Sequence, residues 1–305
     1  MRYAAEYFAT ARERERIRRR RAAGKPAPWT TNLVFRDWRF CNVRREDDVT
    51  TAWFREHVRS RARGAQVVFA TVAFRWFNLI ATGEKLRDLL VGAWDGEEAR
   101  RRLLASEGEE QGQLFTGAYR VAAPHARSQV ITGAYVIKTP DGMTKMDGVL
   151  WCVEEARWRL PTLLADRSFG SSLAGAWESL TTLPYVGGFM AYEVVSDLRW
   201  TDVLGGAQDI LTWANAGPGC RRGLGWVVAG DPEHFGQGVA ARAEMLEVMR
   251  ELLAMSQRDV YWPSRWQPWE MREVEHWSCE FDKYNRARRG ERLKRRFKFG
   301  EGGAA

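Results

Sequence analysis

A short glycine turn at residues 183–188, with the sequence Leu-Pro-Tyr-Val-Gly-Gly, constrains the fold more than any other stretch. Helical apolar patterns lie on both sides of it, at residues 171–180 and from residue 188 onward. Because glycine tolerates positive φ, Gly187 and Gly188 let the chain reverse tightly between two helices. Backbone N–H groups at the start of the second helix can then bind a phosphate. The pattern predicts a helical hairpin that contacts a nucleic-acid backbone, and a plain corner between two helices is the alternative.

Helical periodicity recurs along most of the chain, so the expected fold class is mainly α. Residues 115–150 differ, because four glycines interrupt them, and they predict a small hairpin or an irregular insert. We divide the chain into a charged N-terminal helix (residues 1–24), which we expect to be solvated, a single helical domain (25–298) and a flexible tail (299–305). Further helices are expected at residues 47–57, 65–79, 84–94, 97–107, 149–164, 171–180, 239–255 and 269–289.

The composition narrows the class of partner. A formal net charge of +8 over 305 residues favours a polyanion, because fixed positive charge concentrates phosphates. The four cysteines form no C-x-x-C pair and lie far apart, which argues against a disulfide framework and a zinc ribbon. The N-terminus has no apolar signal core, and the longest apolar stretch is too short to cross a bilayer. We therefore expect a soluble protein of a reducing compartment, with no membrane partner.

The turn at residues 183–188 resembles the helix-hairpin-helix motif of DNA glycosylases, with Tyr185 in place of its first glycine. Asp209 lies 22 positions after Gly187, which resembles the placement of the catalytic carboxylate in base-excision glycosylases. The lysine of lyase-type enzymes is absent, because residues 189–191 are Phe-Met-Ala. Asp202 is an alternative carboxylate, and either aspartate could instead cap a helix.

A second glycine turn follows at residues 217–224, with the sequence Gly-Pro-Gly-Cys-Arg-Arg-Gly-Leu. Gly217 and Gly219 allow the backbone to approach an anion, and Arg221 and Arg222 can bind phosphate oxygens through forked hydrogen bonds. The pattern G-x-x-x-x-G-K-[ST] occurs neither here nor elsewhere in the sequence. A kinase of the P-loop type is therefore unsupported.

Two further clusters carry groups suited to chemistry. Residues 36–48 mix aromatic, amide, guanidinium and carboxylate side chains, as expected of a segment that reads bases and phosphates. Residues 270–284 place Glu273, His276, Glu280 and Lys283 near one face of a predicted helix. A salt-bridged surface helix is the alternative to a catalytic one.

The order of the glycine turns and the two clusters along the chain, together with several shorter segments, resembles that of the alpha-glutamyl/putrescinyl thymine pyrophosphorylase family. That family is also described as the helical domain of 5-hydroxymethyluracil DNA kinases and as amino acid:DNA transferases of bacteriophages. The resemblance extends over roughly residues 24–296. The segments that carry it are residues 29–32, 39–47, 74–78, 116–119, 183–193, 217–224 and 275–284.

The resemblance implies a helix-hairpin-helix, DNA-glycosylase-like fold that acts on phage DNA in which 5-hydroxymethyluracil replaces thymine. A separate kinase pyrophosphorylates the hydroxymethyl group, and members of the family displace the pyrophosphate with an amino acid or a polyamine. The implied partners are double-stranded DNA containing modified uracil and the free amino acid or polyamine. The implied location is the cytoplasm, that of the host if the protein is viral. A DNA glycosylase and a non-catalytic DNA-binding module are the alternatives.

Substitution at the exocyclic methylene of the modified base needs positioning, a stabilised leaving group and a neutral nucleophile. The nucleotide is expected to flip out, with Tyr185, Trp38 or Trp213 stacking on it or filling its place. No cofactor and no metal ligand set are expected, and the sequence leaves open whether Mg²⁺ assists pyrophosphate departure. The candidate catalytic residues are Asp209, Glu275, His276 and Glu280. The candidate substrate- and pyrophosphate-binding residues are Arg39, Asn42, Arg45, Arg75, Asn78, Arg221, Arg222 and Lys283. The candidate DNA-binding residues are Tyr185, Gly187, Gly188, Gly217 and Gly219.

Overall fold

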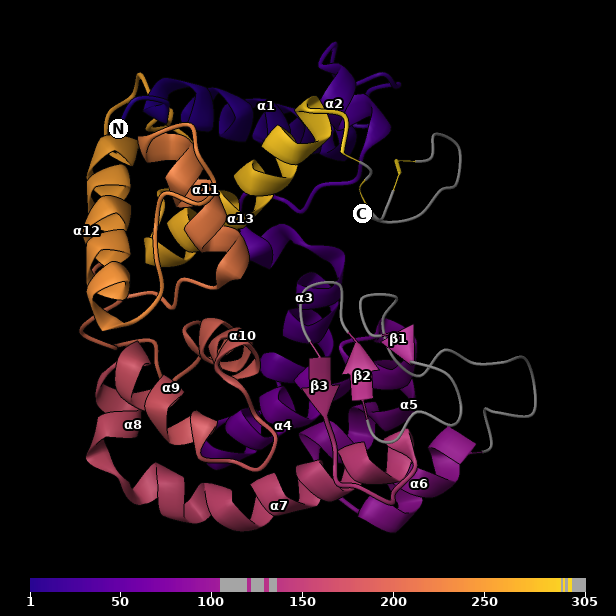
Figure 1. Cartoon of the computed structure of the whole chain (residues 1–305). Coiled ribbons are helices and arrows are strands. Elements are labelled where there is room, and N and C mark those ends of the chain that lie inside the picture. Colours follow the sequence, from indigo (N-terminus) through magenta and orange to yellow (C-terminus); the bar gives the residue numbers. More distant parts are fainter. Residues whose placement is uncertain (105–119, 122–128, 132–135, 292, 294–295, 298–305) are drawn as a thin grey trace. The chain divides into compact units, whose positions relative to one another are not determined.

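The computed structural model describes residues 1–104, 120–121, 129–131, 136–291, 293 and 296–297, and most of them are helical (Figure 1). The prediction of a mainly α fold is confirmed. The chain forms two compact units: a terminal unit (Met1–Val49 with Ile210–Ala305) and a central unit (Thr50–Asp209). The central unit is one continuous segment, whereas the terminal unit combines both ends of the chain. The flexible tail expected at residues 299–305 lies outside the described residues.

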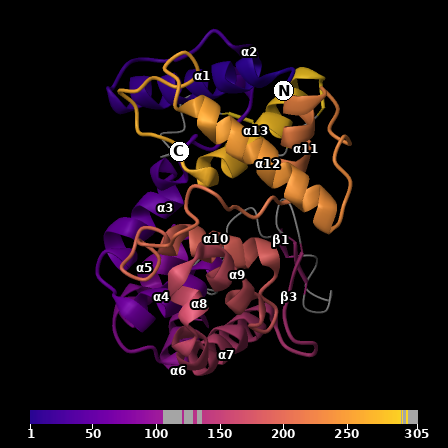
Figure 2. The same cartoon turned by 90° about the vertical axis from the view of Figure 1, so that its left-hand side faces the viewer.

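The terminal unit is built around its last helix, which packs against α11 and α12 (Figures 1 and 2). An aromatic cluster forms its core, in which the rings of Tyr7 and Phe8 meet that of Trp269. Aromatic side chains supply much apolar contact area per residue, so this cluster holds the unit together. The elements are α1 (Ala4–Ala22), α2 (Leu33–Asp37), η1 (Arg45–Asp47), α11 (Pro218–Val228), α12 (Val239–Ser256) and α13 (Met271–Arg288).

The first helix, α1, is not the solvated helix that its charges predict. Tyr7 and Phe8 are fully buried, and the Tyr7 hydroxyl donates a hydrogen bond of 3.0 Å to the carbonyl oxygen of Val274. The many Arg and Glu residues of α1 hide this short aromatic stripe in the sequence pattern. The helix therefore joins the two ends of the chain.

The central unit surrounds one apolar helix, α4 (Gly64–Phe77), whose residues from Val67 onward are all buried. Such a helix needs neighbours on every side, and α5, α7 and α10 supply them. The other helical elements are α3 (Val49–Phe54), the π-helical turn η2 (Arg55–Arg59), α5 (Ile80–Val91), α6 (Gly96–Leu104), α7 (Lys145–Ala165), α8 (Arg167–Ser171), α9 (Leu173–Thr181) and α10 (Gly188–Leu198).

A small antiparallel sheet lies in the stretch where the glycines predict a hairpin or an irregular insert. Its strands are β1 (Arg120–Val121), β2 (Gln129–Ile131) and β3 (Val136–Lys138), and they pair in the order β1-β2-β3. The register aligns Arg120 with Ile131 and Gln129 with Lys138. Among the helices that the structure describes, none combines the length and the apolar character needed to cross a bilayer.

Candidate functional site

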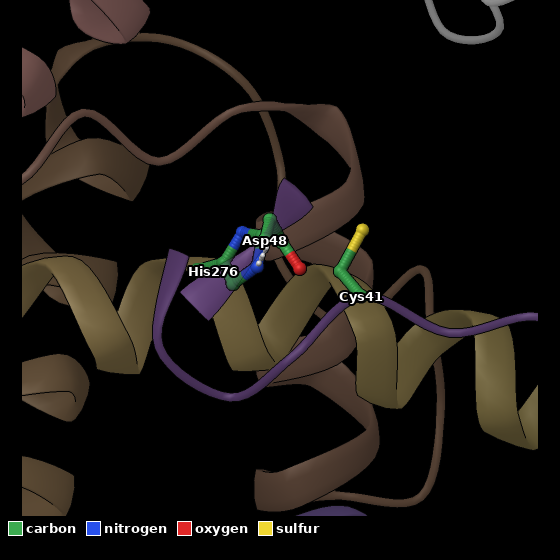
Figure 3. Close-up of side chains that lie close together, drawn as sticks. All are labelled: Cys41, Asp48 and His276. Atoms are coloured by element: carbon green, nitrogen blue, oxygen red, sulfur yellow. Dashed lines mark ion pairs between the residues drawn. The ribbon is translucent and has the colours of Figure 1, made fainter. Parts of the chain in front are cut away.

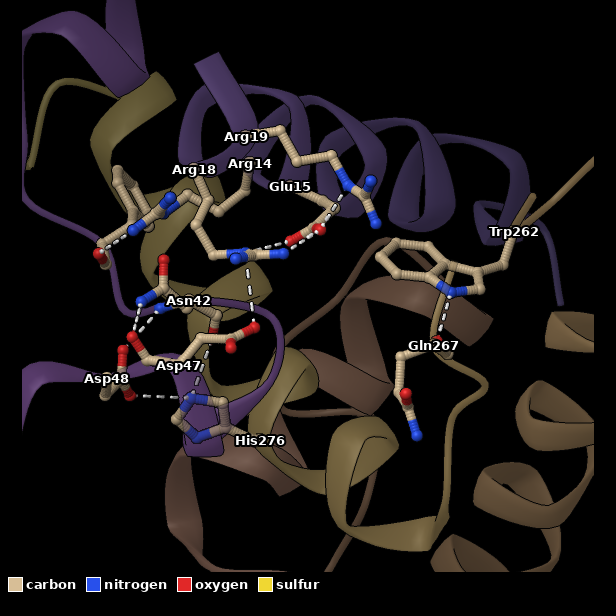
Figure 4. Close-up of polar contacts among 11 residues, drawn as sticks. Arg14, Glu15, Arg18, Arg19, Asn42, Asp47, Asp48, Trp262, Gln267 and His276 are labelled. Carbon is tan, nitrogen blue, oxygen red and sulfur yellow. Dashed lines mark hydrogen bonds and ion pairs between the residues drawn. The ribbon is translucent and has the colours of Figure 1, made fainter. Parts of the chain in front are cut away.

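The segment from Cys41 to Asp48 forms a loop that is closed on itself and fastened to α13 (Figure 4). The Cys41 N–H donates to Oε2 of Glu280 at 2.9 Å. Within the loop, the Asn42 N–H donates to Oδ1 of Asp48 at 2.8 Å, and the Asn42 side-chain amide donates to the carbonyl oxygen of Asp47 at 2.7 Å. We call this segment the 41–48 loop. The backbone and side-chain amides of Asn42 are thus hydrogen-bonded within the loop itself, which fixes the loop's conformation.

His276 projects from α13 toward the 41–48 loop (Figure 4). Its Nε2 lies 3.1 Å from the carbonyl oxygen of Asn42 and 3.7 Å from Oδ2 of Asp48. A carbonyl oxygen only accepts, so Nε2 carries the proton and Nδ1 keeps a lone pair. Burial, and then the positive charges of Arg272 and Arg45, hold the His276 pKa well below its usual range. The imidazole is therefore neutral near pH 7 and acts as an acceptor at Nδ1.

A carboxylate lies beside this imidazole, and the charge of a buried guanidinium acts on that carboxylate. Burial raises the pKa of Asp48 to about 6, against the opposing effects of the Asn42 N–H and of Arg14. The Arg14 side chain is only 5% exposed, and its Nη2 donates to the carbonyl oxygen of Phe40 at 3.2 Å. Its Nη1 is buried and finds no hydrogen-bond partner within the described chain. The surroundings thus hold a guanidinium group with spare donor capacity.

Two more predicted residues border the same loop from α13. Glu280 accepts hydrogen bonds from the Cys41 N–H and, at 3.3 Å, from the ammonium group of Lys283. That ammonium group also lies 4.7 Å from the centre of the Phe40 ring. Arg45 is buried in the loop, and its charge acts on both His276 and Asp48. The two sequence clusters, predicted separately, therefore form one site.

Two other predicted residues flank this site in the sequence, Glu275 on α13 and Arg39 before the 41–48 loop. Glu275 is buried and forms an ion pair with Arg272 on the same helix. Arg39 precedes the loop and is exposed, and burial of Arg21, followed by the charge of Arg39, lowers the pKa of Arg21. Both remain candidate binding or catalytic residues.

The paired arginines of α11 contact protein groups. Arg222 Nε lies 3.2 Å from each carboxylate oxygen of Asp282, and its Nη1 lies 3.1 Å from Glu233. Arg221 donates to the carbonyl oxygen of Phe235 at 3.2 Å. These contacts use part of the donor capacity of the two guanidinium groups. The role of both arginines as pyrophosphate ligands stays a prediction.

The glycines of α11 have a packing reason. A Cβ on Gly219 would overlap the side chain of Cys279, and one on Gly223 would overlap the carbonyl oxygen of Ser278. These two positions let α11 approach α13 closely. Gly217 lies at the N-cap of α11 and faces open space, so no close packing explains this glycine. The predicted approach of an anion to Gly217 stays a prediction.

The segment in which the sequence predicts a helical hairpin consists of α9, a tight turn and α10, all in the central unit. Its role as a helix-hairpin-helix DNA contact stays a prediction. Tyr185 takes φ = 61°, a left-handed conformation at the position where the sequence pattern expects glycine, and its side chain is 43% exposed. The Trp177 indole donates to the carbonyl oxygen of Gly188 at 2.7 Å and fixes the turn. Gly187 caps α10 and faces open space. The turn therefore places an exposed aromatic ring next to the start of α10.

Asp209 ends the central unit and binds the start of α9. Its two carboxylate oxygens accept the backbone N–H groups of Leu173 and Ala174, at 2.6 and 2.9 Å. This is the helix-capping geometry that the sequence leaves open as an alternative. Asp209 and His276 lie in different units. The structure does not test the catalytic role predicted for Asp209.

Arg75 and Asn78 also belong to the central unit. Arg75 holds both carboxylate oxygens of Asp197, at 2.5 and 2.8 Å, and the two side chains are 3% and 1% exposed. Its Nη1 donates to Oδ1 of Asn78 at 2.7 Å, and Asn78 ends α4 in a left-handed conformation. The pair joins α4 to α10, a structural role in addition to the substrate contact predicted for Arg75 and Asn78.

Comparison with known proteins decides the family. Residues 2–294 match the family model described as the 5-hmdU DNA kinase, helical domain. The chain belongs to this family. One curated relative, a 5-hmdU DNA kinase of Bacillus phage SP10, is 26% identical over 298 residues, which cover 91% of this chain and 44% of the relative. The chain thus spans less than half the length of that relative. No solved structure matches.

The resemblance identified from the sequence segments is confirmed at the level of this helical-domain family. The site of this family member also contains three residues that the sequence reasoning did not select. Cys41 and Asp48 fall inside the cluster of residues 36–48, but nothing in that pattern marks them as neighbours of His276. Arg14 was hidden among the many arginines of α1.

Proposed function

We propose that the chain is a DNA-base-modifying transferase that acts on 5-(pyrophosphoryloxymethyl)uracil in DNA. The family description and the name of the SP10 relative support a substrate derived from 5-hmdU in DNA. The sequence resemblance supports transfer of an amino acid or a polyamine. The phage relative also supports a host cytoplasm as the place of action.

The proposed reaction is a substitution at the exocyclic methylene carbon. The amine nitrogen, or a hydroxyl oxygen, forms a bond to this carbon, while the bond from carbon to the pyrophosphate oxygen breaks. Pyrophosphate leaves with the electron pair, and the proton of the nucleophile passes to a base. The protein must hold the two reactants together, stabilise the departing charge and accept that proton.

One observation carries the proposal: the 41–48 loop meets α13, so that the His276 imidazole lies 3.1 Å from Asn42 and Glu280 lies 2.9 Å from the Cys41 N–H. In this arrangement, Nδ1 of His276 is the proton acceptor. The buried carboxylates Glu275 and Glu280 provide negative charge for the ammonium form of the donor. The cationic side chains of Arg45 and Lys283 provide positive charge for the leaving pyrophosphate.

The central unit supplies the proposed DNA contact. The start of α10, at Gly187 and Gly188, suits a backbone phosphate, because the N-terminus of a helix attracts anions. Tyr185 suits stacking on a base, because its ring is exposed. Asp209 is the alternative proton acceptor, with its oxygens oriented by the start of α9.

A second candidate is phosphorylation of 5-hmdU itself, which the name of the SP10 relative favours. The lack of a P-loop pattern in this sequence argues against that type of kinase site. Excision of the base, and DNA binding without chemistry, are the remaining alternatives.

Mass spectrometry of nucleosides separates these possibilities. The protein is incubated with duplex DNA containing pyrophosphorylated 5-hmdU and a panel of amino acids and polyamines, and in parallel with 5-hmdU DNA and ATP. A nucleoside heavier by the donor, with pyrophosphate released, supports the transferase. A phosphorylated nucleoside in the ATP arm supports the kinase, and a free base supports a glycosylase. Unchanged nucleosides across the panel would contradict transfer of every donor tested.

A further inference from the structure

Three side chains of different chemistry converge where the 41–48 loop meets α13 (Figure 3). They are Cys41 and Asp48 from the loop and His276 from the helix. One sulfur, one oxygen and one nitrogen atom from these residues all lie within 4.8 Å of one another. Among the described residues, this is the one group of metal-binding side chains whose donor atoms lie this close together.

The donor set matches a particular ion. Zinc binds thiolate, imidazole and carboxylate ligands at about 2.0–2.3 Å in a tetrahedral arrangement, which places ligand atoms roughly 3.3–3.8 Å apart. Nε2 of His276 and Oδ2 of Asp48 are already 3.7 Å apart. The remaining separations reach at most 4.8 Å, so side-chain movements of about 1 Å complete the geometry. Mg²⁺ and Ca²⁺ prefer oxygen ligands throughout and fit this set poorly.

Neighbouring hydrogen bonds orient two of the three donors. The Asn42 N–H binds Oδ1 of Asp48 at 2.8 Å, so that Oδ2 is the oxygen that faces His276. The Cys41 N–H is held by Glu280 at 2.9 Å, which fixes the backbone that carries the thiol. Such outer contacts are a regular feature of zinc sites, because they hold the ligands in place before the ion arrives.

The charges around the cluster are compatible with an ion of this kind. The nearby cations whose charge acts on these residues include Arg14, Arg45, Arg272 and Lys283, and the nearby anions include Glu280. A zinc ion held by one thiolate, one carboxylate and one neutral imidazole carries no net charge, so the cations do not repel it. The thiolate would also place a negative charge near Arg14, whose buried Nη1 has no hydrogen-bond partner in the described chain.

We propose that Cys41, Asp48 and His276 form a zinc site with an open fourth position. Binding at Nε2 moves the imidazole proton of His276 to Nδ1, so that the ring stays neutral, and releases the thiol proton of Cys41 to solvent. The hydrogen bond from Nε2 to the Asn42 carbonyl oxygen is given up at the same time. Three protein ligands and one exchangeable position are typical of zinc sites that bind a small molecule or water. This inference concerns binding alone and does not rest on the proposed transfer reaction. Because Nδ1 is protonated when zinc occupies Nε2, the zinc-bound state and the state in which Nδ1 accepts a proton are alternatives.

Cobalt substitution tests the site directly. The full chain is stripped with a chelator and titrated with Co²⁺, followed by displacement with Zn²⁺. We expect one equivalent of Co²⁺ to give a thiolate charge-transfer band together with the visible bands of tetrahedral cobalt. Zinc should abolish both. Absence of a thiolate band at one equivalent would overturn the proposal.

Matched cysteine variants locate the ion. Cys41→Ser should remove the thiolate band and weaken Zn²⁺ affinity more than 10-fold. Cys279→Ser is the control, because Cys279 lies on α13 three positions from His276 and is exposed. It should bind both ions like the parent protein. Equal loss in both variants, or loss in neither, would contradict a site at Cys41.

Alkylation of the unmodified protein gives a readout that needs no variant to fold. Zinc should slow alkylation of the Cys41 thiol by iodoacetamide and leave that of Cys279 unchanged, as read by peptide mass spectrometry. Equal rates at Cys41 with and without zinc would count against the site.

Discussion

The Nε2 atom of His276 lies 3.1 Å from the carbonyl oxygen of Asn42, which precedes it by 234 positions in the sequence. This hydrogen bond fixes the tautomer of the imidazole and leaves Nδ1 as its only acceptor. The chemistry proposed for the site depends on that atom.

The substitution His276→Gln separates the roles of the two imidazole nitrogen atoms. The glutamine amide can still donate to the Asn42 carbonyl oxygen, but it has no basic nitrogen. We expect the transfer rate to fall by about 10²–10⁴-fold while the melting temperature changes little, because general-base catalysis contributes effects of this size. Steady-state kinetics on pyrophosphorylated DNA, with thermal unfolding as the control, measures both. Full activity would move the base role to Asp209, and Asp209→Asn would then be the variant that loses transfer.

Asp48 makes stability depend on pH. Its pKa is raised to about 6 in the folded protein, so its favourable contribution is complete below about pH 4 and is lost as the pH rises through 6. Asp48→Asn cannot ionise, and its amide oxygen can still accept the Asn42 N–H. The variant should therefore be more stable than the parent above pH 6, by about 1–3 kcal/mol, and should lose this advantage near pH 4. Urea unfolding at pH 4 and pH 7.5 in the presence of chelator checks the sign.

The buried pair of Arg75 and Asp197 should be essential to the central unit. Arg75→Met leaves the Asp197 carboxylate buried with Arg59 as its remaining guanidinium partner at 3.8 Å, and we expect a loss of about 3–5 kcal/mol. Arg101→Met is the matched control, because Arg101 pairs with Glu98 on an exposed helix face, and its loss should leave unfolding unchanged. Urea denaturation of both variants measures these changes in the free energy of unfolding. Equal stability of the two would contradict the structural role of Arg75.

The glycines of α11 differ in what they tolerate. Gly223→Ala inserts a methyl group against the backbone of Ser278, so we expect destabilisation of at least about 2 kcal/mol. Gly217→Ala meets open space and should change stability by less than about 1 kcal/mol. If Gly217 contacts an anion, this variant should weaken DNA binding while folding normally. Comparable melting temperatures for the two variants would argue against close packing of α11 on α13.

At position 185, glycine should make the protein more stable than alanine does, which is the reverse of their usual order. A left-handed residue with a Cβ costs about 1–2 kcal/mol relative to glycine, so Tyr185→Gly should be more stable than Tyr185→Ala. Both remove the ring, and both should weaken DNA binding equally if the ring stacks on a base. Chemical denaturation and fluorescence anisotropy with duplex DNA measure the two effects. A more stable alanine variant would contradict φ = 61° at this position.

The sequence predicted the local elements well, because each follows from a pattern of neighbours. The ends of α12 and α13 fall within two residues of the expected helices at 239–255 and 269–289. The hairpin was predicted from its glycines, although no rule indicated that Tyr185 would adopt a left-handed conformation.

Long-range pairing was not predictable in the same way. Asp48 and His276 are neighbours only because the 41–48 loop closes on α13, and no local pattern carries that information. For the glycines of α11 the local pattern exists but is ambiguous, because the same spacing suits both an anion-binding turn and a close contact between two helices. Gly219 has the second role in this structure, and only the position of Cys279 reveals it.

The division of the chain into a continuous unit and one made from both ends has a consequence for synthesis. The central unit is complete once Asp209 has left the ribosome. The Tyr7 hydroxyl must instead wait for Val274, its hydrogen-bond acceptor 267 positions later. Because domains fold as units when their segments become available, the central unit should form first during translation, and α1 should stay without its α13 partner until α13 itself has been synthesised.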